Sequence, residues 1–150
     1  MSFPTPIPKI LLVEDSQVDI MIVTEVLQDL AIECDLVTAS NVEDALEELL
    51  VAEGASDAAN LSQRLPTLIL VDINLQGSSG LHLVRELKQD ATFRSIPVVV
   101  LTTSQAPSDV KAAYDLQANC YLRKPIDYAQ FRDLIAMIAA FWLQHAELPA

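Results

Sequence analysis

The sequence predicts an α/β protein, an open and doubly wound sheet of five parallel strands with five helices on its two faces. Two observations support this prediction. Short apolar segments such as Leu68–Val71 run without polar alternation, as in strands that are buried on both faces. These segments alternate with stretches of helical periodicity, which is the pattern of βαβ units. Such units cross over with one hand, and they therefore place helices on both faces of the sheet.

Each expected element has its own local signal. The strands are short and apolar, and they cover residues 9–13, 33–39, 68–71, 98–101 and 120–122. The helices cover about 16–30, 41–52, 79–87, 107–116 and 127–142. Ser16, Asn41 and Asp127 are residue types that favour helix N-caps, and Pro107 suits a first helical turn. Residues 53–66 form a long polar loop, which marks either a flexible segment or an insertion.

Composition indicates one acidic domain. We expect an N-terminal arm at 1–8, a domain at 9–144 and a C-terminal tail at 145–150. The net charge of −12 argues against nucleic acid as a partner, because phosphate binding needs a basic face. No apolar run is long enough to span a membrane, and no signal peptide is evident. Cys34 and Cys120 lack metal-ligand spacing, so we expect buried thiols and a cytoplasmic location.

Polar side chains follow four of the expected strands. With the flavodoxin-like strand order 2-1-3-4-5, the first and third strands are neighbours at the point where ligands bind in such sheets. Glu14 and Asp15 follow the first strand, and Asp72 follows the third. Thr102 and Lys124 follow the fourth and fifth strands. The sequence therefore predicts that these five side chains meet at one rim of the sheet.

Three neighbouring carboxylates repel one another unless a cation lies between them. Oxygen ligands favour Mg²⁺, for which Mn²⁺ could substitute. Glu14, Asp15 and Asp72 are the expected carboxylate ligands, and the backbone carbonyl of Asn74 is a further one. The sequence therefore predicts a magnesium site at this rim.

The same rim suits phosphoryl transfer, which needs little beyond positioning and charge stabilisation. Asp72 is the expected nucleophile, and it would form an aspartyl phosphate. Lys124 would add a positive charge and Thr102 a hydroxyl group around the phosphoryl oxygens. Neither His82 nor His145 is placed to act as a base. Taken singly, Asp72 and Thr102 could also be ordinary strand-end or loop caps.

These positions, together with Pro125 after Lys124, resemble the receiver domain of two-component response regulators (the CheY-like fold) over nearly the whole chain. The resemblance implies Mg²⁺-dependent transfer of a phosphoryl group from a sensor histidine kinase to Asp72. It implies a cis peptide bond before Pro125. It leaves open whether the phosphoryl group passes onward to a downstream phosphotransfer protein.

The resemblance also implies a switch. Thr102 would move toward the phosphoryl group, and the aromatic ring of Tyr121 would turn inward. The surface that changes would comprise the helix from Pro107, the strand at 120–122 and the last helix. A half-buried tyrosine is also ordinary in a strand, so the role of Tyr121 depends on the resemblance.

A narrower resemblance is to the small stand-alone regulators that are paired with phytochrome kinases. It depends on the segments 53–66, 98–104, 119–121 and 141–143. Members of that group dimerise through the last helix, which here is apolar nearly all round. Met137, Phe141 and Trp142 are the expected homodimer surface. The alternative is that Phe141 and Trp142 fold back over the edge of the domain.

The sequence departs from the family pattern in two places. The turn after Asp72 usually holds proline and an acid, where Gln76 and Ser79 stand here. Glycine is frequent before the fifth strand, where Gln117 stands here. The resemblance therefore leaves the rigidity of that turn and the lifetime of the phosphoryl group open.

Two other functions remain to be weighed. One is a Mg²⁺-dependent phosphohydrolase that acts on external substrates, but Asn74 stands two residues after Asp72, where a second acid would be needed. The other is a phosphate-independent binding module of the same fold. We expect no enzymatic activity beyond the protein's own phosphorylation and dephosphorylation.

Overall fold

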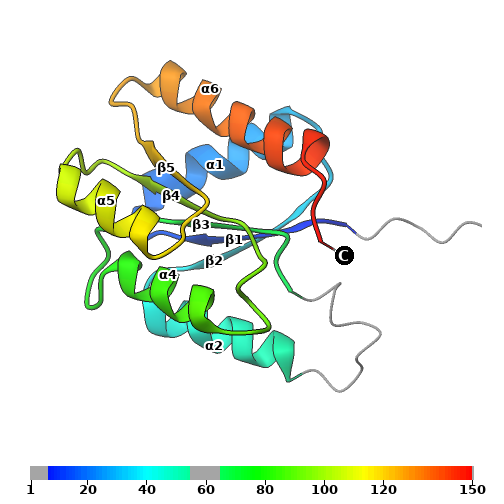
Figure 1. Cartoon of the computed structure of the whole chain (residues 1–150). Coiled ribbons are helices and arrows are strands. Elements are labelled where there is room, and N and C mark those ends of the chain that lie inside the picture. Colours follow the sequence, from blue (N-terminus) through cyan, green and yellow to red (C-terminus); the bar gives the residue numbers. More distant parts are fainter. Residues whose placement is uncertain (1–6, 55–64, 150) are drawn as a thin grey trace, which may run out of the picture.

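The computed structural model describes residues 7–54 and 65–149. Within them, five strands form one parallel sheet in the order β2-β1-β3-β4-β5 (Figure 1), which confirms the predicted sheet. The second strand begins at Asp35, two residues later than expected. The strands are β1 (Lys9–Val13), β2 (Asp35–Ala39), β3 (Leu68–Val71), β4 (Val98–Thr102) and β5 (Cys120–Arg123).

In the described part of the chain, five α-helices follow the strands, and their starts agree with the predicted caps. The side chains of Ser16, Asn41 and Asp127 each accept a hydrogen bond from a backbone N–H in the first helical turn. The last helix continues into a six-residue π-helical segment, η2. The helices are α1 (Gln17–Asp29), α2 (Val42–Glu53), α4 (Gly80–Gln89), α5 (Pro107–Asp115), α6 (Tyr128–Ala139) and η2 (Ala140–His145).

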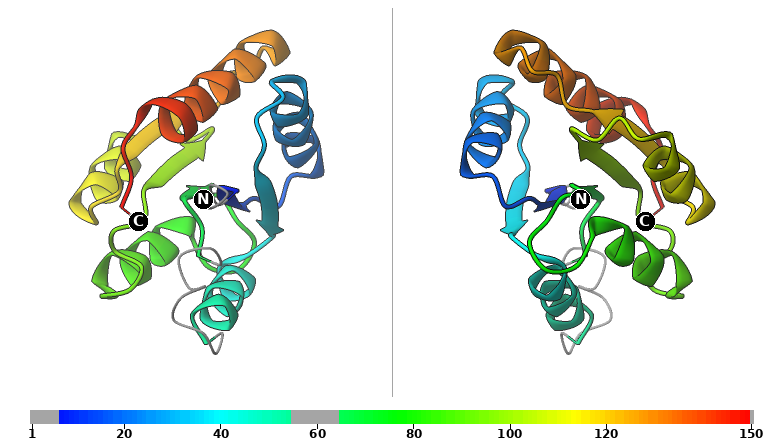
Figure 2. Two further views of the ribbon diagram at one scale, coloured as in Figure 1. Left: turned by 90° about the vertical axis from the view of Figure 1, so that its right-hand side faces the viewer. Right: turned by 90° about the vertical axis from the view of Figure 1, so that its left-hand side faces the viewer.

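Helices cover both faces of the sheet (Figures 1 and 2). Alternate side chains of each central strand enter opposite core layers. Ile69 and Val71 of β3 pack in the layer of α2, α4 and α5, whereas Leu68 and Leu70 pack in the layer of α1 and α6. All four are buried, which explains why the strand is apolar throughout.

Parts of three predicted segments lie outside the described residues, namely 1–6 of the expected arm, 55–64 of the expected loop and 150 of the expected tail. Glu53, which the sequence assigns to the loop, is the last residue of α2. No helix in the described part of the chain is long and apolar enough to cross a membrane.

Candidate functional site

The sheet fixes the backbone of the predicted site residues one position beyond the strands. The N–H of Glu14 donates to the carbonyl of the last residue of β2 at 2.9 Å, and the N–H of Asp72 donates to the last residue of β1 at 3.0 Å. The N–H of Lys124 donates to the carbonyl of Thr102 at 2.7 Å. These side chains therefore start from rigid positions at the same edge of the sheet.

The amine of Lys124 lies among three carboxylates. Its Nζ donates to Glu14 Oε2 at 2.6 Å, to Asp19 Oδ2 at 2.7 Å and to Asp72 Oδ2 at 2.8 Å. The side chains of Lys124 and Glu14 are only 5% and 3% exposed. The structure thus brings the predicted Glu14, Asp72 and Lys124 together, with the ammonium group as the cation of the cluster.

Asp19 is the member of this cluster that the sequence analysis missed. It lies in the first turn of α1, where its N–H donates to the hydroxyl of the N-cap residue Ser16 at 3.3 Å. An acid three residues after a serine N-cap is a recognisable capping position. Because the N-cap Ser16 directly follows Asp15, that spacing could have marked Asp19 as a candidate for the rim, although it does not give the direction of the side chain.

Burial and charge shift two pKa values at this site. Burial raises the pKa of Glu14 to about 7, although the hydrogen bond and charge of Lys124 and the N–H of Ser16 act in the opposite direction. Burial alone would lower the pKa of Lys124, but its hydrogen bonds to Asp19, Asp72 and Glu14 outweigh this and raise it. Three carboxyl groups therefore share one ammonium group, and acidic groups outnumber the cation in this cluster.

The remaining predicted metal ligands lie near this cluster. Asn74 donates its backbone N–H to Asp72 Oδ1 at 2.9 Å. Asp15 follows Glu14 and is half-buried. Within the described residues, no group of three acidic, histidine or cysteine side chains could hold a metal ion as it stands. Glu14 and Asp72 contact Lys124 instead, and the ligand set stays a prediction.

The two predicted switch residues are connected through Ser104. The buried Thr102 Oγ1 accepts the N–H of Ser104 and the Nδ2 of Asn74, both at 3.4 Å. The hydroxyl of Tyr121 donates to the carbonyl of Ser104 at 2.9 Å, and its backbone N–H donates to the hydroxyl of Tyr114 at 3.1 Å. The loop after β4 is thus held by both Thr102 and Tyr121.

The predicted cis peptide bond before Pro125 is wrong for this structure. None of the peptide bonds in the described ranges is cis. The trans form is favoured by about 0.5–1 kcal/mol even before proline. With a trans bond, Lys124 still makes its backbone bond to β4 and its three side-chain bonds to the carboxylates.

The proposed dimer residues differ in their surroundings. Met137 and Phe141 are 58% and 53% exposed. Trp142 is half-buried, packs against the α1–α6 core layer and meets the ring of Phe141 edge-to-face at 5.0 Å. Trp142 therefore folds back over the domain edge, which is the alternative to a dimer contact, whereas Met137 and Phe141 face outward.

Comparisons with known proteins identify the family of this chain. Residues 10–136 match the family model of the response regulator receiver domain. The chain is 38% identical over 141 residues to response regulator Rcp1 of Synechocystis sp., covering 94% of this chain and 92% of that protein. A structure of the phosphorylated cyanobacterial phytochrome response regulator RcpA matches with a TM-score of 0.85 and 37% identity, covering 96% of this chain and 99% of the other.

A second solved structure, the Mn²⁺-bound form of response regulator Rcp1, matches with a TM-score of 0.83 and 37% identity. The match covers 95% of this chain and 99% of the other. Both similarities extend over nearly the full length of the two chains. The chain belongs to the response regulator receiver domain family.

Proposed function

We propose that this protein is a single-domain response regulator that accepts a phosphoryl group on Asp72 from a sensor histidine kinase of the phytochrome type. The observation that carries the proposal is the 2.8 Å contact between Lys124 Nζ and the buried Asp72 carboxylate at the end of the central strand. The similarity to a phytochrome response regulator over nearly the whole chain supports the choice of kinase.

The residues at the rim suit a divalent cation, Mg²⁺ or Mn²⁺. Glu14, Asp15 and Asp72 would supply carboxylate oxygens, and Asn74 would supply its backbone carbonyl. One observation supports this assignment: three carboxyl groups share a single ammonium group in the cluster. The relative Rcp1 has been solved in a Mn²⁺-bound form. When bound, the cation would neutralise charge on the transferred phosphoryl group.

The protein's own side chains orient the nucleophile. Both Asp72 oxygens are held, Oδ1 by the N–H of Asn74 at 2.9 Å and Oδ2 by Lys124 at 2.8 Å. An oxygen of Asp72 attacks phosphorus, the bond from phosphorus to the kinase histidine nitrogen breaks, and its electron pair stays on that nitrogen. The Lys124 ammonium and the Thr102 hydroxyl then pair with phosphoryl oxygens.

The output would be a change of surface. The phosphoryl group carries about −1.5 to −2 charges in place of the single carboxylate charge of Asp72, and it brings new acceptor oxygens beside Thr102. If Thr102 moves to donate to it, the Ser104 N–H loses its acceptor, and the contact from Ser104 to Tyr121 is disturbed. The surface of α5, β5 and α6 would then present a different shape to a partner.

Phosphorylation of the purified protein tests this proposal. With Mg²⁺ and acetyl phosphate, intact mass spectrometry should show the gain of one phosphoryl group, and Asp72→Asn should show none. Asp133→Asn, which removes an exposed carboxylate on α6, should label as the wild type does. Labelling that persists in Asp72→Asn, or steady turnover of added phosphoesters, would count against the response-regulator function.

Phosphotransfer from purified phytochrome histidine kinases tests the choice of partner. Transfer from phytochrome kinases to this chain should be faster than transfer to this chain from kinases with other sensor domains. Equal rates from all kinases would remove the phytochrome assignment and leave the phosphoacceptor role intact.

We also infer a homodimer and a cytoplasmic location. Exposed Met137 and Phe141 on α6 and η2 offer an apolar surface for a second copy. Cys34 and Cys120 are free thiols, as is usual in a reducing compartment.

A further inference from the structure

Within residues 7–54 and 65–149, no strand pairs with the outer edge of β2. Among the described strands, β2 pairs only with β1. Asp35 and Ala39 bond to the β1 side, since the N–H of Asp35 donates to Pro8 and the carbonyl of Ala39 accepts from Glu14. The even-numbered residues of β2 therefore direct their N–H and C=O groups away from β1, where another strand can pair with them. Figure 2 shows β2 at the margin of the sheet, between α1 and α2.

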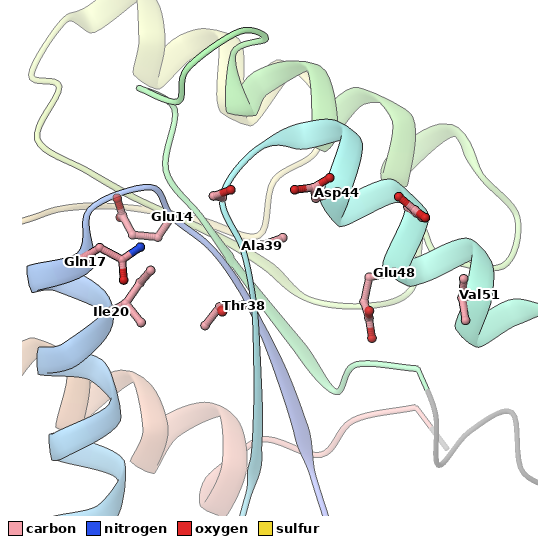
Figure 3. Close-up of a pocket in the computed structure, with 10 residues that line it drawn as sticks. Glu14, Gln17, Ile20, Thr38, Ala39, Asp44, Glu48 and Val51 are labelled. Carbon is pink, nitrogen blue, oxygen red and sulfur yellow. The ribbon is translucent and has the colours of Figure 1, made fainter.

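A cleft of about 470 Å³ lies along this edge at the C-terminal end of β2. Figure 3 shows Gln17 and Ile20 of α1 on one side, Glu48 of α2 on the other, and Thr38 and Ala39 of β2 between them. A strand added beside β2 would enter the space between the two helices.

A smaller hollow of about 160 Å³ continues along the same edge. Its walls include Leu36 of β2 together with Thr24 and Leu27 of α1. Leu36 is two residues before Thr38 of the cleft, and Thr24 is one helical turn after Ile20. Residues of α1 and β2 line both spaces in the same order along the chain, and we refer to the cleft and the hollow together as the α1–β2 groove.

The charge of the groove defines what it can bind. Ten residues line the cleft, and they include four carboxylates, Glu14, Asp44, Glu47 and Glu48, but no lysine, arginine or histidine. Glu14 is held by Lys124 and Glu48 by Lys9, at 2.6 and 3.6 Å. Asp44 and Glu47 are exposed. The cleft is therefore negative, whereas the smaller hollow is mainly lined by apolar groups.

We propose that the α1–β2 groove binds an extended, basic segment of a partner protein, which adds as a strand beside β2. Backbone hydrogen bonds to the open edge hold such a segment, and pockets for its side chains select the sequence. An apolar side chain enters the hollow at Leu36, and lysine or arginine side chains follow toward the cleft. A second copy of this chain is a poor occupant, because its net charge is also −12. Binding does not require phosphorylation of Asp72.

Capped synthetic hexapeptides test the proposal with the full chain and no phosphodonor. One peptide has three valines followed by three lysines, a second has the reverse order for antiparallel addition, and a control replaces lysine by glutamate. At least one lysine peptide should bind saturably below millimolar concentration, and the glutamate peptide should not. In amide NMR spectra, the shifted signals should include Leu36 and Thr38 and lie along α1, β2 and the first turns of α2.

Charge reversal identifies the site. Glu47→Lys should weaken binding of the lysine peptide at least tenfold, whereas Glu86→Lys, an exposed acid on α4, should change it less than threefold. Thr38→Pro removes an N–H that points outward from an edge strand, and it should abolish binding while the fold persists. If Thr38→Pro does not fold, the comparison of Glu47→Lys with Glu86→Lys still decides.

Three results would overturn the proposal. The first is no saturable binding of either lysine peptide, and the second is equal loss in the Glu47→Lys and Glu86→Lys variants. The third is a homodimer that Glu47→Lys dissociates, since this would make a second copy the occupant of the edge. Phosphorylation of Asp72 is measured separately, so failure here leaves the proposed function standing.

Discussion

At the scale of single residues, Lys124 has the largest effect that we expect on stability. Without its ammonium group, the buried Glu14 and Asp72 and the partly buried Asp19 would repel one another with no cation between them. Lys124→Met should therefore lower the free energy of unfolding by about 3–5 kcal/mol in metal-free buffer. Urea denaturation with a chelator present measures this change.

The matched control is Lys111→Met, which breaks an exposed ion pair with Asp115 on α5. Exposed pairs of this kind contribute about 0.3–0.5 kcal/mol. Similar small losses in both variants would mean that the carboxylates around Lys124 are well hydrated in solution.

Gly80 permits the close contact between α4 and the end of β3. A Cβ atom at this position would lie 2.9 Å from the carbonyl carbon of Asp72 and closer still to its oxygen. Gly80→Ala must therefore push α4 away from Asp72, which should cost about 1–3 kcal/mol and slow labelling by acetyl phosphate. In the control Gly54→Ala, the new Cβ would lie 3.2 Å from its nearest neighbour, the backbone oxygen of Leu50. The free energy of unfolding should therefore change by less than about 1 kcal/mol, and labelling should be unchanged. Normal labelling of Gly80→Ala would contradict this role.

The sequence could reveal a site residue only where a strand end fixes the position of that residue. Glu14, Asp72 and Lys124 directly follow strands, so strand order alone brings them to one rim. Asp19 reaches the rim from inside a helix, and the direction of its side chain depends on where α1 crosses the sheet. The contact of Lys124 with all three carboxylates depends on packing and could not be deduced from spacing.

At the scale of elements, the end of α5 contains backbone strain. Gln117 has φ +75°, in the left-handed region, where it closes the helix. The N–H of Gln117 donates to Tyr114, and that of Ala118 donates to Ala113, at 2.9 and 3.0 Å. This pair of bonds is the Schellman motif, which favours glycine at the position of Gln117.

Gln117→Gly should therefore stabilise the protein. A left-handed conformation costs a residue with a side chain roughly 1–2 kcal/mol, and the extra freedom of unfolded glycine offsets about 0.5–1 kcal/mol of this. Thermal unfolding should show a net gain near 0.5–1 kcal/mol for Gln117→Gly. Gln117→Ala keeps the strain and should show no gain, so equal effects of the two variants would refute the explanation.

Element boundaries were predictable where a local signal sets them. Ser16, Asn41 and Asp127 cap their helices with side-chain hydrogen bonds, as expected. The π-helical segment η2 has no such signal. Its Trp142 and Leu143 both pack against the α1–α6 layer, so its geometry is part of the tertiary packing.

At the scale of the whole molecule, the sheet order was predictable because apolar strands alternate with helices of ordinary length. A strand such as Leu68–Val71, apolar at every position, needs cover on both faces, and only a few layered architectures provide it. The sequence indicates less clearly which surface residues are available to contact another protein. The helical pattern of α6 shows an excess of apolar residues, but it does not show which of them fold back and which face outward.

Self-association is the prediction that depends on this distinction. Met137 and Phe141 face outward, whereas Trp142 packs on the domain's own core. Met137→Glu combined with Phe141→Glu should therefore dissociate a dimer without unfolding the monomer, because neither side chain is buried there. Sedimentation velocity of the wild type and the double variant, with and without acetyl phosphate, measures the change. Leu50→Glu alters an equally exposed apolar residue on α2 and should leave the dimer intact. A wild type that stays monomeric at high concentration in both conditions would exclude α6 as a dimer surface, and a dimer lost in Leu50→Glu would place the interface on α2.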